Sequence, residues 1–286
     1  MTISDAIIQG SVQGLTEFLP ISSSGHLAIS QYFLGIKENN LFFNVALHLG
    51  TLLSILAVYH KIIVRLVVAF FVSLGNFLKG KTASSKDGKI LLNLVLSCMP
   101  LWLMFFPIPK MGVKLKDFAS HLADSQNLVA VGIALLVTSF LLFLGSRFMN
   151  IQGGHVRVRS LSEMTPVNAV LIGFAQLISA VFPGLSRSGT TLSAGLFCGV
   201  DRQAALDFSF IMAIPAIIAA FLTEFLKIRG SMAGVSLKII STGVVTSAVV
   251  GFFSIIIFKW FLKKDKTWLF VVYTMALGIM SILIGI

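Results

Sequence analysis

The chain has 286 residues, of which 56% are hydrophobic and only 12% are charged, and its formal net charge is +11. Soluble domains carry about 25% charged residues, so this composition excludes an ordinary soluble domain and predicts a helical membrane protein. The basic residues fall mostly between apolar runs, as the positive-inside rule expects, and no aromatic-rich basic motif suggests nucleic acid as a partner.

The first apolar stretch, 5–36, is broken by the sequence PISSSG at 20–25. We expect two short helices in a re-entrant hairpin, because a polar break at membrane depth is tolerated only inside protein or beside a wet cavity. The next run, 41–60, is long enough to span a bilayer. Segment 61–81 carries basic residues at both ends. It predicts a helix at the interface or one that extends the previous span, and a seventh span is the alternative.

Two more spans follow in the first half, and a second broken stretch, 167–200, is interrupted by PGLSRSG at 183–189. This stretch predicts a second re-entrant hairpin. We therefore predict an all-α integral membrane protein with six spanning helices and two re-entrant hairpins, forming a single membrane domain over 1–286. The spans predicted besides 41–60 are 89–106, 127–146, 204–226, 239–258 and 267–286.

The two broken stretches resemble each other. In each, Gly-x-x-Gln is followed seven residues after the Gln by a Pro and then by Ser-Gly, with one residue inserted in the second break. The likeness indicates a duplication, with repeat one at about 1–146 and repeat two at about 167–286. Three spans between the copies would invert the second copy, and paired broken segments are typical of a midplane site. The matched residues are Gly10, Gln13, Pro20, Ser24 and Gly25, then Gly173, Gln176, Pro183, Ser188 and Gly189.

Lysine and arginine counts predict the orientation. Fourteen of these residues fall on one side of the predicted spans and seven on the other. The side with fourteen should face the cytoplasm. Both termini and the first hairpin would then lie on the outer side, and the second hairpin would enter from the inner side.

A carboxyl group lies within the first hairpin. Gln13 and Glu17 are four residues apart and share one helix face. A charge at membrane depth is costly and marks a functional candidate. Carboxylate and amide oxygens suit a divalent cation, so we predict a metal site at Glu17 and Gln13, with Mg²⁺ or Ca²⁺ as the ion.

The two polar breaks predict an anion site. The serines can cap the second short helix of the first hairpin, and a helix N-terminus attracts anions. Arg187 adds a guanidinium that binds phosphate through two hydrogen bonds. The alternatives are serines that act only as caps, a packed His26, and an Arg187 paired only with Glu17. The predicted catalytic residues are Glu17, Ser23, His26 and Arg187, and the predicted substrate-binding residues are Ser22, Ser24, Gly25, Ser186, Ser188, Gly189 and Thr191.

Together these groups predict phosphoryl transfer. A serine or histidine can attack phosphorus or pass a proton, while the guanidinium, the amides and a cation bind the phosphate oxygens. The depth of the hairpins in the bilayer indicates a phosphate carried by a lipid. Asn44 and His48 could line the same cavity or pack between helices, and Asp207 holds the matching place in the second half.

These motifs resemble a known family, the bacterial undecaprenyl-diphosphatases, also called bacitracin-resistance proteins. The likeness runs over essentially the whole chain and rests on QGLTE at 13–17, which continues into FLPISSSGH at 18–26, and on PGLSRSGTT at 183–191. The resemblance implies a plasma-membrane enzyme that removes the terminal phosphate of undecaprenyl diphosphate. That reaction recycles the lipid carrier for cell-wall synthesis and gives bacitracin resistance. The resemblance also implies dependence on a divalent cation and a site open to the outer face.

The resemblance implies residue roles as well. Glu17 and Gln13 would serve the metal or act as the base, and Arg187 would bind the diphosphate. The nucleophile stays open: Ser23 with His26 as its partner is our first choice, direct attack by His26 the second, and metal-activated water the third. Gln13 stands where many relatives have Glu, which could weaken metal binding. The residues expected to line the site are Ser23, His26, Ser186 and Thr191.

Two other hypotheses remain open. Inverted repeats with broken helices are the architecture of secondary transporters, so the chain could move its lipid instead of cleaving it, or do both. A lipid kinase is disfavoured because the sequence has no P-loop or kinase signature. The sequence leaves the oligomeric state open, a homodimer included.

Overall fold

The computed structural model describes residues 1–36, 41–78, 85–108, 112–124, 127–151, 156–227 and 236–286. Within these ranges the regular structure is helical, and strand pairing is limited to two isolated bridges. In the described part of the chain, five helices are long and apolar enough to cross a membrane, or six if one bent pair forms a single span. The predicted all-helical membrane fold is therefore confirmed.

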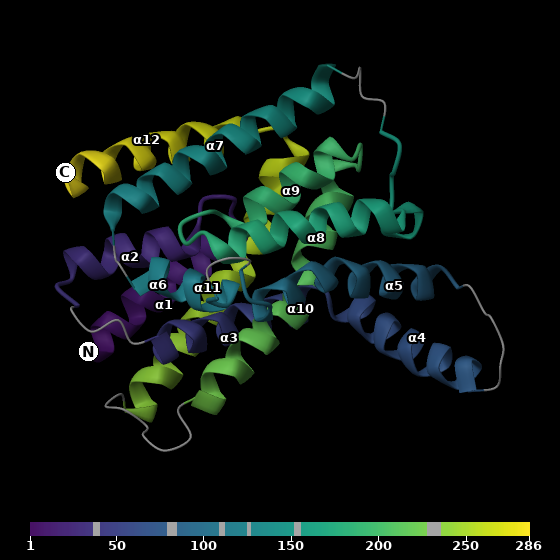
Figure 1. The fold of residues 1–286 in the computed structure, drawn as a ribbon, viewed down its shortest axis with the longest axis horizontal. Helices are drawn as coiled ribbons and strands as arrows, with labels where there is room; N and C mark the ends of the chain where they lie inside the picture. The colour runs from purple at the N-terminus through teal and green to yellow at the C-terminus, as the bar shows by residue number, and fades with distance from the viewer. Residues whose placement is uncertain (37–40, 79–84, 109–111, 125–126, 152–155, 228–235) are drawn as a thin grey trace.

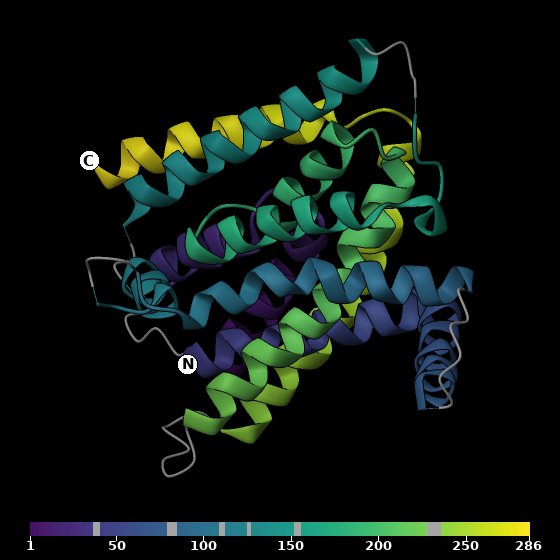
Figure 2. The same ribbon diagram turned by 45° about the vertical axis from the view of Figure 1, so that its right-hand side comes forward.

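Five of the six predicted spans appear as single apolar stretches. The predicted span 89–106 is α5 followed by a 3₁₀ segment, and the helix tightens where Pro100 enters near the start of that segment. In both views α7 and α12 lie side by side at one edge of the molecule (Figures 1 and 2). The five stretches are α5 (Lys86–Cys98) with η1 (Met99–Phe105), α7 (Leu128–Ile151), α10 (Arg202–Lys227), α11 (Leu237–Lys263) and α12 (Trp268–Gly285).

The remaining predicted span, 41–60, is α3 (Leu41–Val58), and the ambiguous segment 61–81 after it forms α4 (His60–Leu78). The two helices meet at an angle of 87°. α4 therefore does not continue α3 in line, and it packs against α5, as Figure 1 shows at the right. Its outer face exposes Val64, Val68 and Phe71. A helix at the membrane interface stays our prediction for α4.

Both predicted broken stretches are helical hairpins. The first consists of α1 (Ile3–Phe18) and α2 (Ser23–Phe33), and the second of α8 (Pro166–Val181) and α9 (Arg187–Phe197). In the second break Gly184 has a φ of 87°, a left-handed conformation that costs glycine little. Ser22 adopts a φ of 70° in the first break without that freedom. The polar breaks found in the sequence are thus confirmed as the points where each hairpin turns.

The two breaks share the same local construction. Ser22 caps α2 by accepting a hydrogen bond from the N–H of Gly25 at 3.2 Å, and Ser186 caps α9 by accepting one from Gly189 at 3.1 Å. The breaks also bond to each other. The N–H of Gly184 donates to Ser24 Oγ at 3.2 Å, and Ser188 Oγ donates to the carbonyl of Leu19 at 2.9 Å. Residues about 160 positions apart in the chain thereby form one polar centre.

Each hairpin packs its first helix on a long helix from the other half of the chain. α1 lies against α11, and α8 lies against α5 and η1. The approach is close at the matched glycines: a Cβ added to Gly10 would lie 2.6 Å from the carbonyl oxygen of Gly243, and one added to Gly173 would lie 2.3 Å from that of Ser97. Small residues allow such backbone contact between membrane helices. The inverted relation of the repeats, at 1–146 and 167–286, stays a prediction. The packing of each hairpin on a helix of the other half supports it.

We expect Gly173→Ala to lower the stability of the protein. Its Cβ would meet backbone atoms of Ser97 that cannot rotate away, and overpacking of this kind costs about 1–3 kcal/mol. Thermal unfolding in detergent should show a clearly lower midpoint. Gly75→Ala in α4 is the matched control, because a Cβ there meets nothing within 4 Å. An unchanged midpoint for Gly173→Ala would contradict the close α8–α5 contact.

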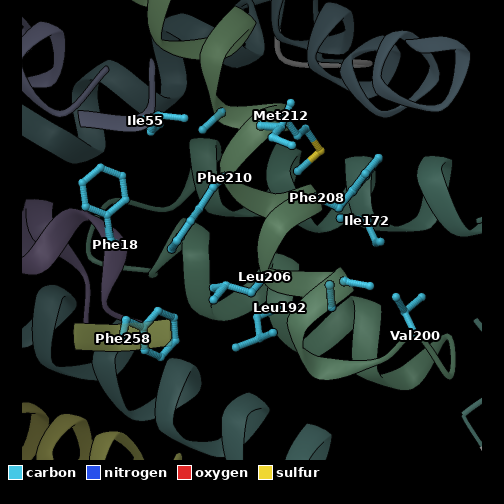
Figure 3. Close-up of a cluster of buried hydrophobic side chains, with 14 of the residues drawn as sticks. Phe18, Ile55, Ile172, Leu192, Val200, Leu206, Phe208, Phe210, Met212 and Phe258 are labelled. Atoms are coloured by element: carbon cyan, nitrogen blue, oxygen red, sulfur yellow. The ribbon is translucent and has the colours of Figure 1, made fainter. Parts of the chain in front are cut away.

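An aromatic cluster anchors the end of α1. Phe18 meets Phe210 of α10 edge-on with ring centroids 5.2 Å apart, and Phe210 lies 6.3 Å from Phe258 of α11. Figure 3 shows these rings together with Ile55 and Leu192 in the buried core. Aromatic contacts bury a large apolar area in a fixed geometry. The preceding residue, Glu17, therefore stands on a backbone that the core holds in place.

Candidate active site

Glu17 lies at the centre of the polar site and is 6% exposed. Ser23 Oγ donates to its Oε2 at 2.6 Å, and Gln13 Nε2 donates to the same oxygen at 2.9 Å. From the other hairpin, Arg187 Nη2 donates to Oε1 in an ion pair. A buried charge needs such partners, because its desolvation is otherwise uncompensated. The fold thus brings four of the predicted residues into one hydrogen-bonded group.

His48 of α3 joins this group. Its Nδ1 lies 2.8 Å from Gln13 Nε2 and 3.4 Å from Glu17 Oε2. The imidazole of His48 therefore contacts both the amide of Gln13 and the carboxylate of Glu17. The sequence predicted only that His48 could line the cavity. That prediction rested on the presence of two polar residues, Asn44 and His48, four positions apart in an apolar span.

A cavity of about 570 Å³ opens beside Glu17. The N-termini of α2 and α9 both reach it, and the first N–H groups of a helix lack intrahelical partners. Arg187 Nη1 is buried and has no hydrogen-bond partner among the described residues, so the guanidinium keeps a donor for a ligand. Such a cavity suits an anion with several oxygens. The predicted residues that line it are Glu17, Ser22, Ser23, Ser24, Ser186, Arg187 and Ser188.

A second, more apolar cavity of about 620 Å³ adjoins the first. The two share Ser24, His48 and Pro183 in their linings. The second cavity runs between α2, α7 and α8, and Leu27 and Val131 are among its lining residues. A polar cavity next to an apolar one suits a ligand with a charged head and a hydrocarbon chain.

Lys116 of α6 (Leu115–Asp124) also lines the polar cavity, next to Asp117. No sequence pattern indicated this position, because Lys116 lies between two predicted spans, where lysines are common. In the structure it adds a cation at the edge of a site that already holds Arg187. The carboxyl group of the neighbouring Asp117, which also lines the cavity, limits the net gain in positive charge.

His26 does not bond to Ser23, which corrects our expectation of a Ser23–His26 pair. Its Nδ1–H donates to the carbonyl of Ser22 at 2.7 Å, and its Nε2 accepts from the hydroxyl of Tyr273 at 2.8 Å. The first hydrogen bond joins residues one helical turn apart, and it orients the imidazole ring toward α12, away from Glu17. Neither cavity described above is lined by His26.

Thr191 and the two cap glycines shape the breaks without lining either cavity described above. Thr191 Oγ1 donates to the carbonyl of Arg187 at 2.7 Å and lies 2.6 Å from Ser209 Oγ. Gly25 and Gly189 give their N–H groups to the capping serines. These three residues hold the helix starts in position, so any effect on a ligand acts through the backbone.

The predicted cation ligands offer few free oxygens. Among the described residues, no group of three or more His, Cys, Asp or Glu side chains could hold a metal ion. Both oxygens of Glu17 already accept hydrogen bonds, while Gln13 Oε1 is buried and without a partner in the described part of the chain. This set suits a Mg²⁺-like ion that keeps several waters and takes its other ligands from a phosphate.

The fold and this site define a multi-pass membrane protein in which two helical hairpins meet at a carboxylate–guanidinium pair beside a cavity suited to an anion. The chain belongs to the family of the bacitracin resistance protein BacA, whose sequence profile matches residues 6–280. This finding confirms the resemblance noted from the two motifs.

Curated relatives match over almost their whole length. An undecaprenyl-diphosphatase of Thermomicrobium roseum is 36% identical over 99% of this chain and 98% of the relative. One of Treponema denticola is 35% identical over 98% of this chain and 96% of the relative. One of Alkaliphilus metalliredigens is 34% identical, and the alignment covers both chains completely.

Proposed function

We propose that this protein hydrolyses undecaprenyl diphosphate to undecaprenyl phosphate and inorganic phosphate, recycling the lipid carrier for cell-wall synthesis and giving bacitracin resistance. The observation that carries the proposal is the Glu17–Arg187 pair, which joins the two hairpins beside Ser23 and a cavity suited to an anion. The names of the relatives support the substrate and the reaction.

In this mechanism the cavity binds the diphosphate. Arg187 offers Nη1, and the starts of α2 and α9 offer backbone N–H groups. The prenyl chain of the bound lipid would extend from the polar cavity into the neighbouring apolar cavity. Donors fixed before the reaction stabilise charge that develops on the phosphate oxygens without having to reorganise.

Ser23 is the proposed nucleophile, and its hydrogen bond to Glu17 makes the carboxylate the proposed base. Ser23 Oγ forms a bond to the terminal phosphorus while its proton passes to Glu17. The P–O bond to the lipid phosphate breaks, and the lipid phosphate leaves with the electron pair. Glu17 passes the serine proton to the departing lipid phosphate and is a carboxylate again. Water then attacks the phosphoserine and gives a proton to Glu17, which returns it to Ser23 Oγ as the P–O bond to the serine breaks and inorganic phosphate leaves. His26 and a metal-activated water stay as the alternative nucleophiles.

A divalent cation, Mg²⁺ or Ca²⁺, is part of the proposal. Glu17 and Gln13 Oε1 would hold it together with phosphate oxygens. When bound, such an ion neutralises phosphate charge. Glu17 would then exchange one of its present donors for the ion.

We place the protein in the bacterial plasma membrane with its site open to the outer side. The excess of Lys and Arg on one side of the spans supports this orientation. The oligomeric state, monomer or homodimer, is separate from this proposal, because the described site is built from one chain.

Phosphate release from a long-chain prenyl diphosphate by the purified protein tests the function. We expect release that EDTA stops and that added Mg²⁺ or Ca²⁺ restores. Arg187→Lys should lower it about 100-fold or more, because an ammonium group cannot bind Glu17 and phosphate at the same time through a planar fork. Arg202→Lys, in an exposed ion pair with Asp265, is the matched control and should stay active.

Two outcomes would contradict the proposal. Lipid binding without phosphate release under any metal would remove the hydrolase function, and the protein should then be tested in liposomes as a lipid transporter. Full activity in EDTA would remove the cation from the mechanism.

A further inference from the structure

Gln176 of α8 has no role in the mechanism above, yet it is 2% exposed and lines the polar cavity. Neither its Oε1 nor its Nε2 has a hydrogen-bond partner among the described residues. Leaving both ends of a buried amide unpaired is costly, and native proteins rarely do so. An unpaired amide beside a cavity therefore points to a ligand.

The first hairpin shows what this position binds. Gln13 stands seven residues before Pro20, as Gln176 stands seven before Pro183. Gln13 Nε2 donates to the carboxylate of Glu17 at 2.9 Å. Ser23, the first residue of α2, donates to the same oxygen at 2.6 Å. In this hairpin, an amide and the first side chain of the second helix hold one anionic oxygen between them.

In the second hairpin the donors are present, but the carboxylate is not. Gln176 takes the place of Gln13, and Arg187, the first residue of α9, takes the place of Ser23. Four residues after Gln176 stands Ala180, which also lines the cavity. A methyl group thus occupies the position where the first hairpin has Glu17. Arg187 Nη1 is buried and also without a partner in the described part of the chain.

We propose that Gln176 and Arg187 Nη1 form a second oxyanion subsite that binds an oxygen of a phosphate group. The ligand's oxyanion would take the part in the second hairpin that the Glu17 carboxylate takes in the first. The phosphate belongs to the lipid diphosphate or is the released inorganic phosphate. The inference deepens the proposed function and rests on it for the lipid arm of its test.

The test compares Gln176→Met, which keeps the volume but removes the amide, with Gln203→Met as the matched control. Gln203 is a glutamine of α10 that bonds to Asp207 and lines neither cavity described above. Three quantities are measured: KM and kcat for a long-chain prenyl diphosphate, the equilibrium binding of inorganic phosphate to the purified protein, and Tm in detergent.

We expect Gln176→Met to weaken phosphate recognition about 10-fold or more, since a hydrogen bond to a charged group is lost. A higher KM with unchanged binding of inorganic phosphate assigns the subsite to the lipid diphosphate, and weaker binding of inorganic phosphate assigns it to the product. The Tm of Gln176→Met should not fall, because the amide of Gln176 makes no hydrogen bond to a described residue that the substitution would break.

The proposal is overturned if KM and phosphate binding both stay within about twofold of wild type, or if Tm falls while the folded fraction keeps wild-type constants. If wild type itself releases no phosphate from the lipid, the proposed function fails. The binding of inorganic phosphate by wild type and Gln176→Met then still decides on the subsite.

Discussion

Glu17→Gln is expected to lower kcat for phosphate release by about 10³-fold or more. The variant removes the proposed base of Ser23, and general-base catalysis alone contributes about 10²–10⁴-fold. It also removes the anion between Arg187 and the first hairpin. The measurement is steady-state phosphate release at saturating lipid. Asp87→Asn, in an exposed ion pair with Arg65, is the control and should keep its activity.

Loss of activity in Glu17→Gln must be separated from loss of folding. Breaking a buried ion pair by removing one partner costs about 3–5 kcal/mol, because the other charge stays buried and unpaired. The double variant Glu17→Gln with Arg187→Gln removes both charges, so its Tm should recover toward wild type while its activity stays absent. A Glu17→Gln protein with more than a tenth of wild-type activity would show that this carboxylate is not the base.

Ser23→Ala is expected to lower kcat by about 10³-fold or more with little change in Tm. The substitution removes the proposed nucleophile, while Gln13 and Arg187 still satisfy Glu17. Acid-quenched wild type, analysed by mass spectrometry during turnover, should carry phosphate on Ser23. Ser30→Ala, in the same helix but outside both cavities described above, is the matched control.

The nucleophile can be reassigned from the same experiment. If Ser23→Ala loses less than about tenfold, attack by the serine is excluded, because a covalent route cannot proceed without its nucleophile. His26→Gln then distinguishes the two alternatives. An inactive His26→Gln with phosphate found on the histidine of wild type would assign attack to the imidazole, and an active one would assign it to a metal-activated water.

The sequence alone determined the class of protein, the approximate helices and the places where they break. Length and apolarity of a run decide whether a helix can cross a bilayer, and these are properties of neighbouring residues. Polar breaks such as PGLSRSG interrupt a helix for equally local reasons. Glu17 and Arg187 could be found because charges are costly at membrane depth. The matched breaks predicted only that both residues lie at one site.

The partner of each side chain depends on how the helices pack in three dimensions. Ser23 bonds to Glu17, while His26 turns to Tyr273, because one hydrogen bond to Ser22 sets the direction of the imidazole ring. His48 reaches the site through the packing of α3, which no short pattern encodes. The 87° turn between α3 and α4 was equally hidden, since both segments are apolar and helical.

The unpaired amide of Gln176 illustrates the same difference between sequence and structure. The sequence shows that Gln176 matches Gln13, because each stands seven residues before a proline. Whether a buried amide finds a partner depends on residues brought near it from other helices, and here the described ones supply none. Spacing thus fixed the position of the amide, whereas three-dimensional packing decided that it is left available to a ligand.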